Sequence, residues 1–227
     1  MNGYSKIKSF AKINLALNIV GKSLLIHKIE SIISFLDLSD EILIKEINKK
    51  KHLIKFTGKF SKNIGNTNTI SKLLEILDKK KLLNDKKYEI KIKKNIPIQS
   101  GLGGGSMNAA SVFKFLKKTQ KIKISQKEIL NITNFVGSDV ILGMYSKNLI
   151  LKSNGSIHSI PSLKSKNVLV IKPNFGCSTK KIYSKVRKFD SSKFNNPKKE
   201  LFSYSKLQNM SNHLEFIAFK IYPRLKI

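Results

Sequence analysis

The 227-residue chain has no tryptophan and a single cysteine, Cys177, and its four histidines are scattered. One cysteine excludes an internal disulfide framework, favours a reducing cytoplasm and leaves no zinc-ligand spacing with the histidines. No apolar run approaches the roughly 18 residues of a membrane span, and no apolar stretch follows a basic head at the N-terminus as in a secretory signal. We therefore expect a cytoplasmic protein with no disulfide, no membrane contact and no zinc site.

Acidic residues are also scarce, because 14 Asp and Glu face 44 Lys and Arg, which leaves a formal net charge of +30. Such a charge is typical of nucleic-acid binders, whose lysines neutralise phosphates. Here, however, the lysines are spread over the whole chain, and no aromatic residues interleave with a basic segment to stack on bases. We favour a biased coding composition as the source of the charge and expect no nucleic-acid partner. A small polyphosphate substrate would also be attracted by this positive field.

Hydrophobic residues make up 41% of the chain, enough to bury a core in one large domain or two small ones. Predicted strands come first along the sequence and helices are mixed in after them, an order that indicates an α+β fold. The predicted strands cover 10–20, 31–47 (as two strands broken near Ser39 and Asp40), 52–56, 88–96, 148–151, 156–160 and 167–172. The predicted helices cover 69–83 with Asn68 as N-cap, 106–118, 125–135, a segment from 178 or 179, and 210–221. Residues 187–206 are polar and predict a long loop.

Four glycines stand in the five positions from Gly101 to Gly105, directly before the helix predicted from Ser106. Glycine lets backbone N–H groups approach a phosphate closely and adopts φ angles that other residues avoid. The helix N-terminus adds unpaired N–H groups and a favourable dipole. Ser106 could bring a hydroxyl to a phosphate or to its metal ion. The segment therefore predicts a cradle for nucleotide phosphates, with a merely flexible loop as the alternative.

Three common phosphate motifs do not fit this segment. The Walker pattern needs a lysine after the last glycine, and none is present. A dinucleotide pattern started at Gly101 requires glycine where Ser106 stands. The protein-kinase loop fails for the same reason, and it lies between two strands instead of before a helix.

The full string from Pro97 to Ala110, PIQSGLGGGSMNAA, resembles the nucleotide loop of the GHMP kinase superfamily. This resemblance implies ATP and Mg²⁺ as cofactors and a two-domain α+β fold. It implies an ATP-binding domain with a mixed sheet at 1–150 and a smaller, incomplete α/β domain at 151–227. The implied ATP-binding residues of the loop are Pro97, Ile98, Gln99, Ser100, Gly101, Leu102, Gly103, Gly104, Gly105, Ser106, Met107 and Asn108.

Four further segments, in order along the chain, resemble one branch of the superfamily: 9–22, 35–44, 137–143 and 212–225. Members of this branch phosphorylate the 2-hydroxyl of 4-diphosphocytidyl-2-C-methyl-D-erythritol in non-mevalonate isoprenoid biosynthesis. The resemblance therefore implies a small-molecule kinase whose partner is a cytidine-diphosphate substrate. We expect a monomer or homodimer.

Residue roles follow from the resemblance position by position. Asp139 takes the place of the general base, and Lys12 takes the place of its cationic partner. The implied substrate-binding residues are Asn14, His27, which would contact the cytosine, and Thr179. Two further residues, Asn68 and Lys94, match the adenine side of the ATP site. Magnesium would sit among the phosphates, without a dedicated protein site.

Ordinary structural roles remain open for several of these residues. Asp139 could be a helix cap, Lys94 a surface charge and His27 a plain polar residue. Lys12 lies inside an apolar strand, where burial without a partner is costly, and this favours a site. Asn14 is two residues further on, so we expect its side chain on the same face of the strand.

The sequence also departs from the family pattern. Ile26 stands where the family has a tyrosine that would stack on the cytosine, Ile141 replaces a proline, and the chain stops before the family's final segment. An unpaired sheet edge and an uncovered apolar face are then expected. Two alternatives therefore stay open: another GHMP kinase with a different alcohol substrate, and an inactive nucleotide- or RNA-binding remnant. The presence of both Lys12 and Asp139 argues against an inactive remnant.

Overall fold

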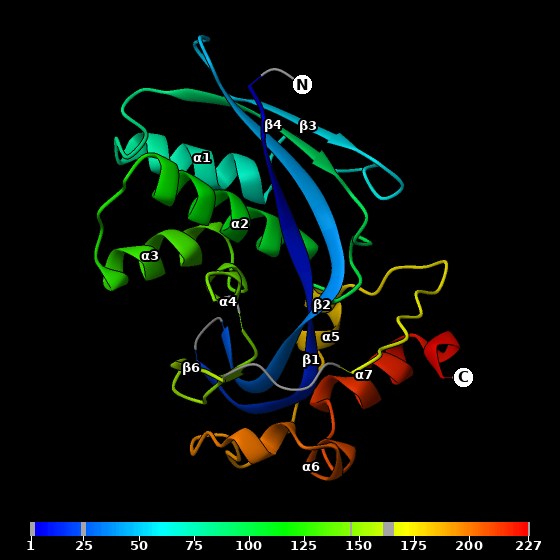
Figure 1. Ribbon diagram of the computed structural model, residues 1–227. Helices are drawn as coiled ribbons and strands as arrows, with labels where there is room; N and C mark the ends of the chain where they lie inside the picture. The colour runs from blue at the N-terminus through cyan, green and yellow to red at the C-terminus, as the bar shows by residue number, and fades with distance from the viewer. Residues whose placement is uncertain (1–2, 24–25, 146, 161–165, 227) are drawn as a thin grey trace. The chain divides into compact units, whose positions relative to one another are not determined.

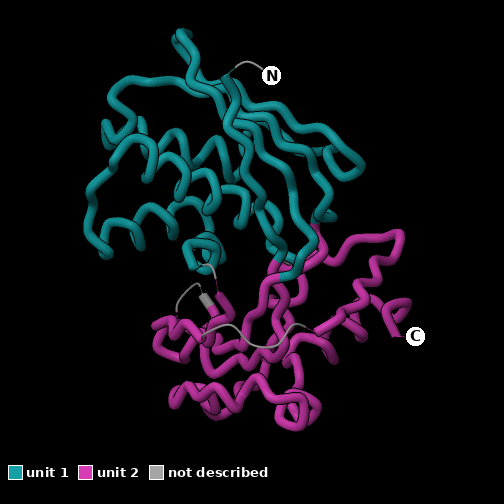
Figure 2. Tube along the Cα trace, in the orientation of Figure 1, with its two compact units in different colours: residues 1–11, 36–98, 102–146 teal, residues 12–35, 99–101, 147–227 magenta. Residues whose placement is uncertain are grey.

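The computed structural model describes residues 3–23, 26–145, 147–160 and 166–226 and confirms the mixed α+β architecture (Figure 1). The chain divides into two compact units (Figure 2). Unit 1 comprises residues 1–11, 36–98 and 102–146, and unit 2 comprises residues 12–35, 99–101 and 147–227. Both units are discontinuous because the long strands β1 (Ser5–Ser23) and β2 (Ile26–Ile47) contribute to each. The division of the sequence near residue 150 stays a prediction.

Unit 1 combines a sheet with helices. Strand β4 (Lys87–Lys93) runs antiparallel to β2, with Ile42 opposite Ile92, and β3 (Leu53–Thr57) runs parallel to β4. The helices of this unit are α1 (Thr69–Lys79), α2 (Gly104–Thr119), α3 (Gln126–Val136) and the short α4 (Val140–Gly143). In Figure 1 the helices α1, α2 and α3 lie on one side of these strands. Alternate strand residues and one stripe of each helix form a shared core, which includes Ile42, Ile44, Leu73, Leu77, Ile90, Ile92, Val112 and Phe113.

The prediction that residues 31–47 form two strands is wrong, because β2 continues without a break through Ser39 and Asp40. Asp40 is fully buried, and its Oδ1 accepts hydrogen bonds from the backbone N–H groups of Asn95 (2.7 Å) and Ile96 (2.8 Å). A polar pair normally predicts a turn. Here the carboxylate is instead satisfied by a distant segment, so the strand does not need to end.

Unit 2 contains shorter elements around the other parts of β1 and β2. Strand β5 (Leu149–Leu151) runs antiparallel to β2 and to β6 (Ile157–Ser159). The remaining elements are α5 (Thr179–Tyr183), the 3₁₀ helix η1 (Lys199–Phe202), α6 (Tyr204–Gln208), α7 (His213–Ile221) and the 3₁₀ helix η2 (Pro223–Leu225). None of the helices in the described ranges is long and apolar enough to cross a bilayer.

The strand predicted at 167–172 is wrong for the residues that the structure describes there. Four consecutive apolar residues, Val168 to Ile171, keep between 40% and 84% of their surface exposed. An alternating or apolar run becomes a strand only when a neighbouring strand takes up its backbone hydrogen bonds. No pairing to 167–172 occurs within the described part of the chain.

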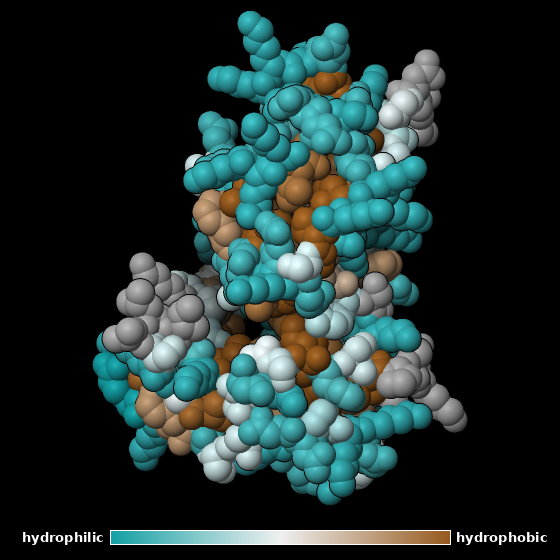
Figure 3. All heavy atoms as spheres, turned by 90° about the vertical axis from the view of Figure 1, so that its left-hand side faces the viewer, coloured by the Kyte–Doolittle hydropathy of each residue, from teal (hydrophilic) through white to brown (hydrophobic). Residues whose placement is uncertain are grey.

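The prediction of one long loop at 187–206 is only partly right. The segment carries η1 and the start of α6, and it buries Phe194 and Phe202. Its anchor is Glu30 of β2, a fully buried residue whose carboxylate accepts hydrogen bonds from Ser192 Oγ (2.7 Å) and from two backbone N–H groups. On the face drawn in Figure 3 hydrophilic side chains predominate, in keeping with the spread of lysines along the sequence.

Candidate active site

The glycine loop (residues 97–105) ends in helix α2, which begins at Gly104, two residues before the predicted start. Gly101 and Gly103 have φ angles of +75° and +69°, in the left-handed region where side chains are strained. Gly103 occupies the N-cap position and supplies no side chain to cap the helix. The first-turn N–H groups of α2 are therefore arranged as an anion-binding helix terminus requires.

The start of helix α1 lies against the start of α2. Thr69 Oγ1 donates a hydrogen bond to the carbonyl oxygen of Gly105 (2.7 Å), and a methyl group placed on Gly105 would lie 3.4 Å from that hydroxyl. Two helix N-termini thus meet beside the glycines, and their dipoles both favour a negative ligand there. Asn68 caps α1 as predicted, since its Oδ1 accepts from the N–H groups of Ile70 and Ser71. Its proposed role toward adenine stays a prediction.

Lys94 lies in the protein interior and is only 2% exposed. Its ammonium forms an ion pair with Asp40, so the interpretation of Lys94 as a surface charge is wrong. A methyl group on Gly104 would lie 3.2 Å from Lys94 Nζ and 3.0 Å from Ile96 Cγ2. The lysine is therefore positioned against the first turn of α2.

Asp139 precedes α4 on a segment that packs against the first turns of α2. A methyl group on Gly137 would lie 3.9 Å from Ser106 Oγ, and one on Gly143 would lie 2.5 Å from the Ala110 Cβ. Asp139 occupies the N-cap position of α4, but its side chain makes no capping hydrogen bond. The helix-cap interpretation of this carboxylate is therefore not supported, while unit 1 does bring its segment beside Ser106.

Several of the predicted ATP-binding residues serve packing instead of presenting side chains to a ligand. Pro97, Leu102, Met107 and Asn108 are all buried. Among the described residues no donor reaches Asn108 Oδ1. Ser106 and Ile98 are half-buried and Gly105 is exposed, so the accessible part of the loop is mainly backbone.

Lys12 belongs to unit 2 and is 6% exposed. Its ammonium donates a hydrogen bond to Asn14 Oδ1 (2.7 Å), and Asn14 Nδ2 donates to Ser31 Oγ (2.7 Å). Ser31 Oγ in turn donates to the carbonyl oxygen of Ala16 (2.7 Å). The prediction that Lys12 and Asn14 share one face of the strand is confirmed, and this chain of hydrogen bonds fixes the position of the ammonium.

His27 and Thr179 are the other predicted substrate residues of unit 2. The ring of His27 lies beside that of Tyr183, with centroids 5.3 Å apart and planes tilted by 41°. Tyr183 is one helical turn after the exposed Thr179 on α5. Tyr183 was not among the predicted substrate residues, although a spacing of four residues from Thr179 places both on one face of a helix. Partial burial, together with the charge of Lys22, lowers the pKa of His27 below its ordinary value of 6.5.

Three loop residues also belong to unit 2: Gln99, Ser100 and Gly101. Gln99 is exposed and has a φ of +52°, which is unusual for a residue with a side chain. A methyl group on Gly176 would lie 2.9 Å from Gln99 Oε1, the end of an exposed and flexible side chain that can move aside.

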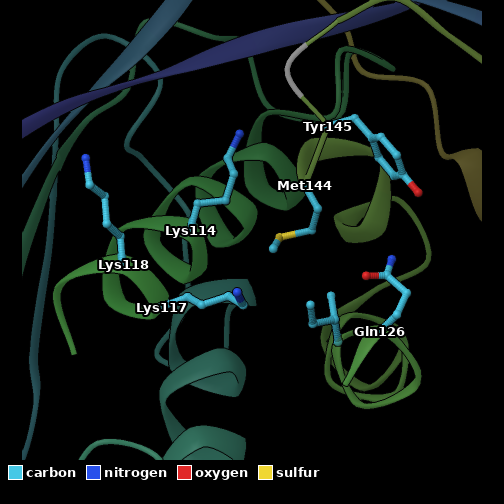
Figure 4. A pocket seen from close by; sticks show the side chains of 7 residues that line it. Lys114, Lys117, Lys118, Gln126, Met144 and Tyr145 are labelled. Atoms are coloured by element: carbon cyan, nitrogen blue, oxygen red, sulfur yellow. The ribbon is translucent and has the colours of Figure 1, made fainter. Parts of the chain in front are cut away.

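A cavity of about 540 Å³ lies between α2, α3 and the residues after α4, and none of the predicted site residues lines it (Figure 4). It is lined by Lys114, Lys117, Lys118, Gln126, Ile129, Met144 and Tyr145. Within the described ranges no three His, Cys, Asp or Glu side chains are grouped to hold a metal ion. Oxygen donors near the glycine loop, such as Ser106 and Asp139, are nevertheless of the type that Mg²⁺ prefers.

Comparison with known proteins identifies relatives across the chain. Residues 68–147 match the family model described as the GHMP kinases N terminal domain. The chain is 55% identical to the 4-diphosphocytidyl-2-C-methyl-D-erythritol kinase of Pelagibacter ubique, over 100% of this chain and 80% of that protein. It is 34% identical to the kinase of the same name from Thermoanaerobacter pseudethanolicus, over 79% of this chain and 61% of that protein.

The structure agrees with these sequence relationships. A crystal structure of 4-(cytidine 5'-diphospho)-2C-methyl-D-erythritol kinase matches with a TM-score of 0.70 and 21% identity, covering 98% of this chain and 80% of that one. At this identity the match shows the shared fold, while the sequence relatives show the family. The chain therefore belongs to the 4-diphosphocytidyl-2-C-methyl-D-erythritol kinases, a family of small-molecule kinases within the GHMP kinases.

Proposed function

We propose that this chain transfers the γ-phosphoryl group of ATP to the 2-hydroxyl of 4-diphosphocytidyl-2-C-methyl-D-erythritol. The observation that carries the proposal is the packing of the 137–143 segment, with Asp139, against the α2 turns that follow the glycine loop. The 55% identity to a kinase named for this substrate supports the choice of alcohol. We further propose a cytoplasmic enzyme, a monomer or homodimer, with no membrane or nucleic-acid partner.

The glycine loop and the first turns of α1 and α2 hold the nucleotide phosphates in this proposal. Backbone N–H groups donate to the phosphate oxygens, and the two helix dipoles favour their negative charge. Ser106 contributes its hydroxyl. Magnesium bound with the nucleotide would neutralise phosphate charge there, and the Ser106 hydroxyl is the oxygen donor of unit 1 that would help to hold it.

Asp139 acts as the general base. It accepts the proton of the 2-hydroxyl as that oxygen forms a bond to the γ-phosphorus, while the bond to the bridging oxygen breaks and ADP leaves. Lys12 stabilises the negative charge of the reacting oxygens through its ammonium. Its hydrogen bond to Asn14 holds that ammonium in one orientation before substrate binds, so little reorganisation is needed during the reaction.

His27, Tyr183 and Thr179 recognise the cytidine part of the substrate. A lowered pKa keeps His27 neutral near pH 7, so its ring nitrogens offer one donor and one acceptor to the cytosine edge. Tyr183 offers an aromatic face on which a base can stack, in a chain that has Ile26 where the family has a tyrosine.

A substrate panel tests the proposal. Purified chain receives Mg-ATP with 4-diphosphocytidyl-2-C-methyl-D-erythritol, with the same alcohol lacking the cytidine part, or with mevalonate, homoserine or galactose, and ADP release is measured. We expect release with the cytidine substrate and about 100-fold lower kcat/KM without the cytidine part. Faster turnover of another alcohol would indicate a different GHMP kinase. No ADP release from a folded chain that binds RNA tightly would contradict any kinase function.

A further inference from the structure

We infer that Asp40 is a positioning residue for nucleotide binding, because its buried carboxylate holds both ends of the glycine loop. This inference rests on the proposed function only in taking the loop as the phosphate site. Asp40 lies on β2, 57 positions before Pro97 in the sequence. Among the described residues, its hydrogen bonds go to neighbours of the loop and not to the loop glycines themselves. It acts through three neighbouring residues.

The first end of the loop is held directly. Asp40 Oδ1 accepts the N–H groups of Asn95 (2.7 Å) and Ile96 (2.8 Å), the two residues before Pro97. Asn95 Nδ2 also donates to the carbonyl oxygen of Ser39 (2.9 Å). Three hydrogen bonds therefore tie the chain to β2 immediately before the loop begins.

The second end is held through Lys94. Asp40 Oδ2 pairs with the Lys94 ammonium, and that ammonium lies so close to Gly104 that a methyl group there would be 3.2 Å away. The backbone of Lys94 is fixed independently, because its N–H donates to the Thr57 carbonyl oxygen (2.7 Å). Gly58 permits this contact, since a methyl group there would lie 2.9 Å from the Lys94 carbonyl oxygen. The first residue of α2 thus rests on a side chain that Asp40 orients.

Electrostatics explain why the lysine needs this partner. An ammonium beside a helix N-terminus is repelled by the helix dipole, and burial adds a desolvation penalty. Asp40 neutralises the ammonium and leaves the N–H groups of α2 as the positive end that an anion meets. A buried ion pair is in general a poor source of stability, because apolar residues of similar size often replace it without loss. Positioning of the loop is therefore the function that these contacts support.

Two double variants separate the role of the acceptor from the role of the charge. Asp40→Asn/Lys94→Met keeps an oxygen for the Asn95 and Ile96 N–H groups, whereas Asp40→Leu/Lys94→Met removes it, and neither leaves a buried unpaired charge. The readouts are ADP affinity by calorimetry and hydrogen exchange of residues 97–105. We expect the leucine variant to bind ADP about tenfold more weakly than the asparagine variant, with faster exchange in the loop. Equal affinity and equal exchange in two folded variants would overturn the inference.

Asp78→Asn is the matched control. Asp78 pairs with Lys87 (2.7 Å) and His52 (3.1 Å) in the same unit, away from the loop contacts described above. We expect ADP affinity within about twofold of the unchanged chain. If the leucine variant does not fold, exchange in the unchanged chain still decides: the Asn95 and Ile96 N–H groups must be protected before ADP is added, and rapid exchange there would refute their anchoring by Asp40. ADP binding does not depend on the alcohol, so a wrong substrate assignment would leave this test intact.

Discussion

His27 shows how a single residue can make substrate binding depend on pH. Because partial burial and the charge of Lys22 lower its pKa below 6.5, the ring is mostly neutral at and above that pH and becomes mostly protonated only at lower pH. Protonation removes the acceptor that we propose for the cytosine edge. We expect the Kd of the cytidine substrate to be flat from pH 8 down to about 6.5 and to rise below that, measured by calorimetry without ATP.

His27→Gln is the control for this prediction, because glutamine keeps a donor and an acceptor and does not titrate in that range. Its Kd should be independent of pH. A Kd of the unchanged chain that already rises between pH 8 and 7, or a variant with the same pH profile, would show that another group titrates.

Gly143 is the residue at which α4 meets α2. A methyl group there would lie only 2.5 Å from the Ala110 Cβ, so Gly143→Ala requires the two helices to separate. We expect a loss of about 1–3 kcal/mol in the free energy of unfolding, measured in urea, as in other overpacked cores. Gly65→Ala is the control, because nothing lies within 4 Å of its added methyl group. Equal stability of both variants would contradict the packing of α4 described here.

At the scale of elements, Glu30 fixes the 187–206 segment on β2. Burial alone would raise the pKa of Glu30, but hydrogen bonds from Asn18, Ser192 and the N–H groups of Lys193 and Phe194 hold it below the ordinary value of 4.5. A carboxylate with a lowered pKa stabilises the fold above its unfolded pKa, and this contribution is lost as the pH falls through the lowered value.

We expect Glu30→Gln to reduce the free energy of unfolding by about 1–3 kcal/mol at pH 7, because the amide turns a donor toward groups that are donors themselves. Urea unfolding at pH 7 and at pH 3 measures this change. The difference between the variant and the unchanged chain should shrink at pH 3, below the ordinary pKa, because the stabilisation by the charged carboxylate decreases as the pH falls toward the lowered pKa. A difference that is the same at both pH values would exclude the charged hydrogen bonds as its source.

Local sequence patterns predicted those features of the helices and strands that depend on residues close in sequence. The N-cap of α1 at Asn68 follows from residues within one turn and was predicted. The helix predicted at 125–135 likewise begins at its own cap, Ser125. The unbroken β2 strand depends on Asp40 meeting Asn95 and Ile96, more than 50 positions away, and no local pattern contains that contact. The same holds for Phe194, whose backbone N–H donates to Glu30, a residue distant in sequence.

At the scale of the whole molecule, a net charge of +30 should draw anionic ligands to the protein. Dissolved salt screens such attraction beyond the Debye length, which is about 10 Å at 0.1 M ionic strength. We expect the Kd of ADP to rise about tenfold between 0.05 M and 0.5 M salt, measured by calorimetry. Adenosine, which has no phosphate, is the control and should change by less than about twofold. If the Kd values of ADP and adenosine changed equally with salt, attraction of the phosphates could not be the cause of the change.

The site as a whole was only partly predictable. The string of glycines predicts a phosphate site from its chemistry alone, whereas the roles proposed for Lys12 and Asp139 come from the resemblance to the family. The burial of Lys94 and the place of Tyr183 beside His27 are tertiary facts, and they change what these residues can do. Exposure of 168–171 is likewise invisible in an apolar run.

The central claim is that this chain is a kinase whose base is Asp139. Its most direct test is the transfer of labelled γ-phosphate from ATP to 4-diphosphocytidyl-2-C-methyl-D-erythritol, with product position read by phosphorus NMR. We predict phosphate on the 2-hydroxyl, and a kcat lowered about 100-fold or more in Asp139→Asn with ADP affinity unchanged. Transfer by Asp139→Asn at the rate of the unchanged chain, or no labelled product from a folded chain that binds ADP, would contradict it.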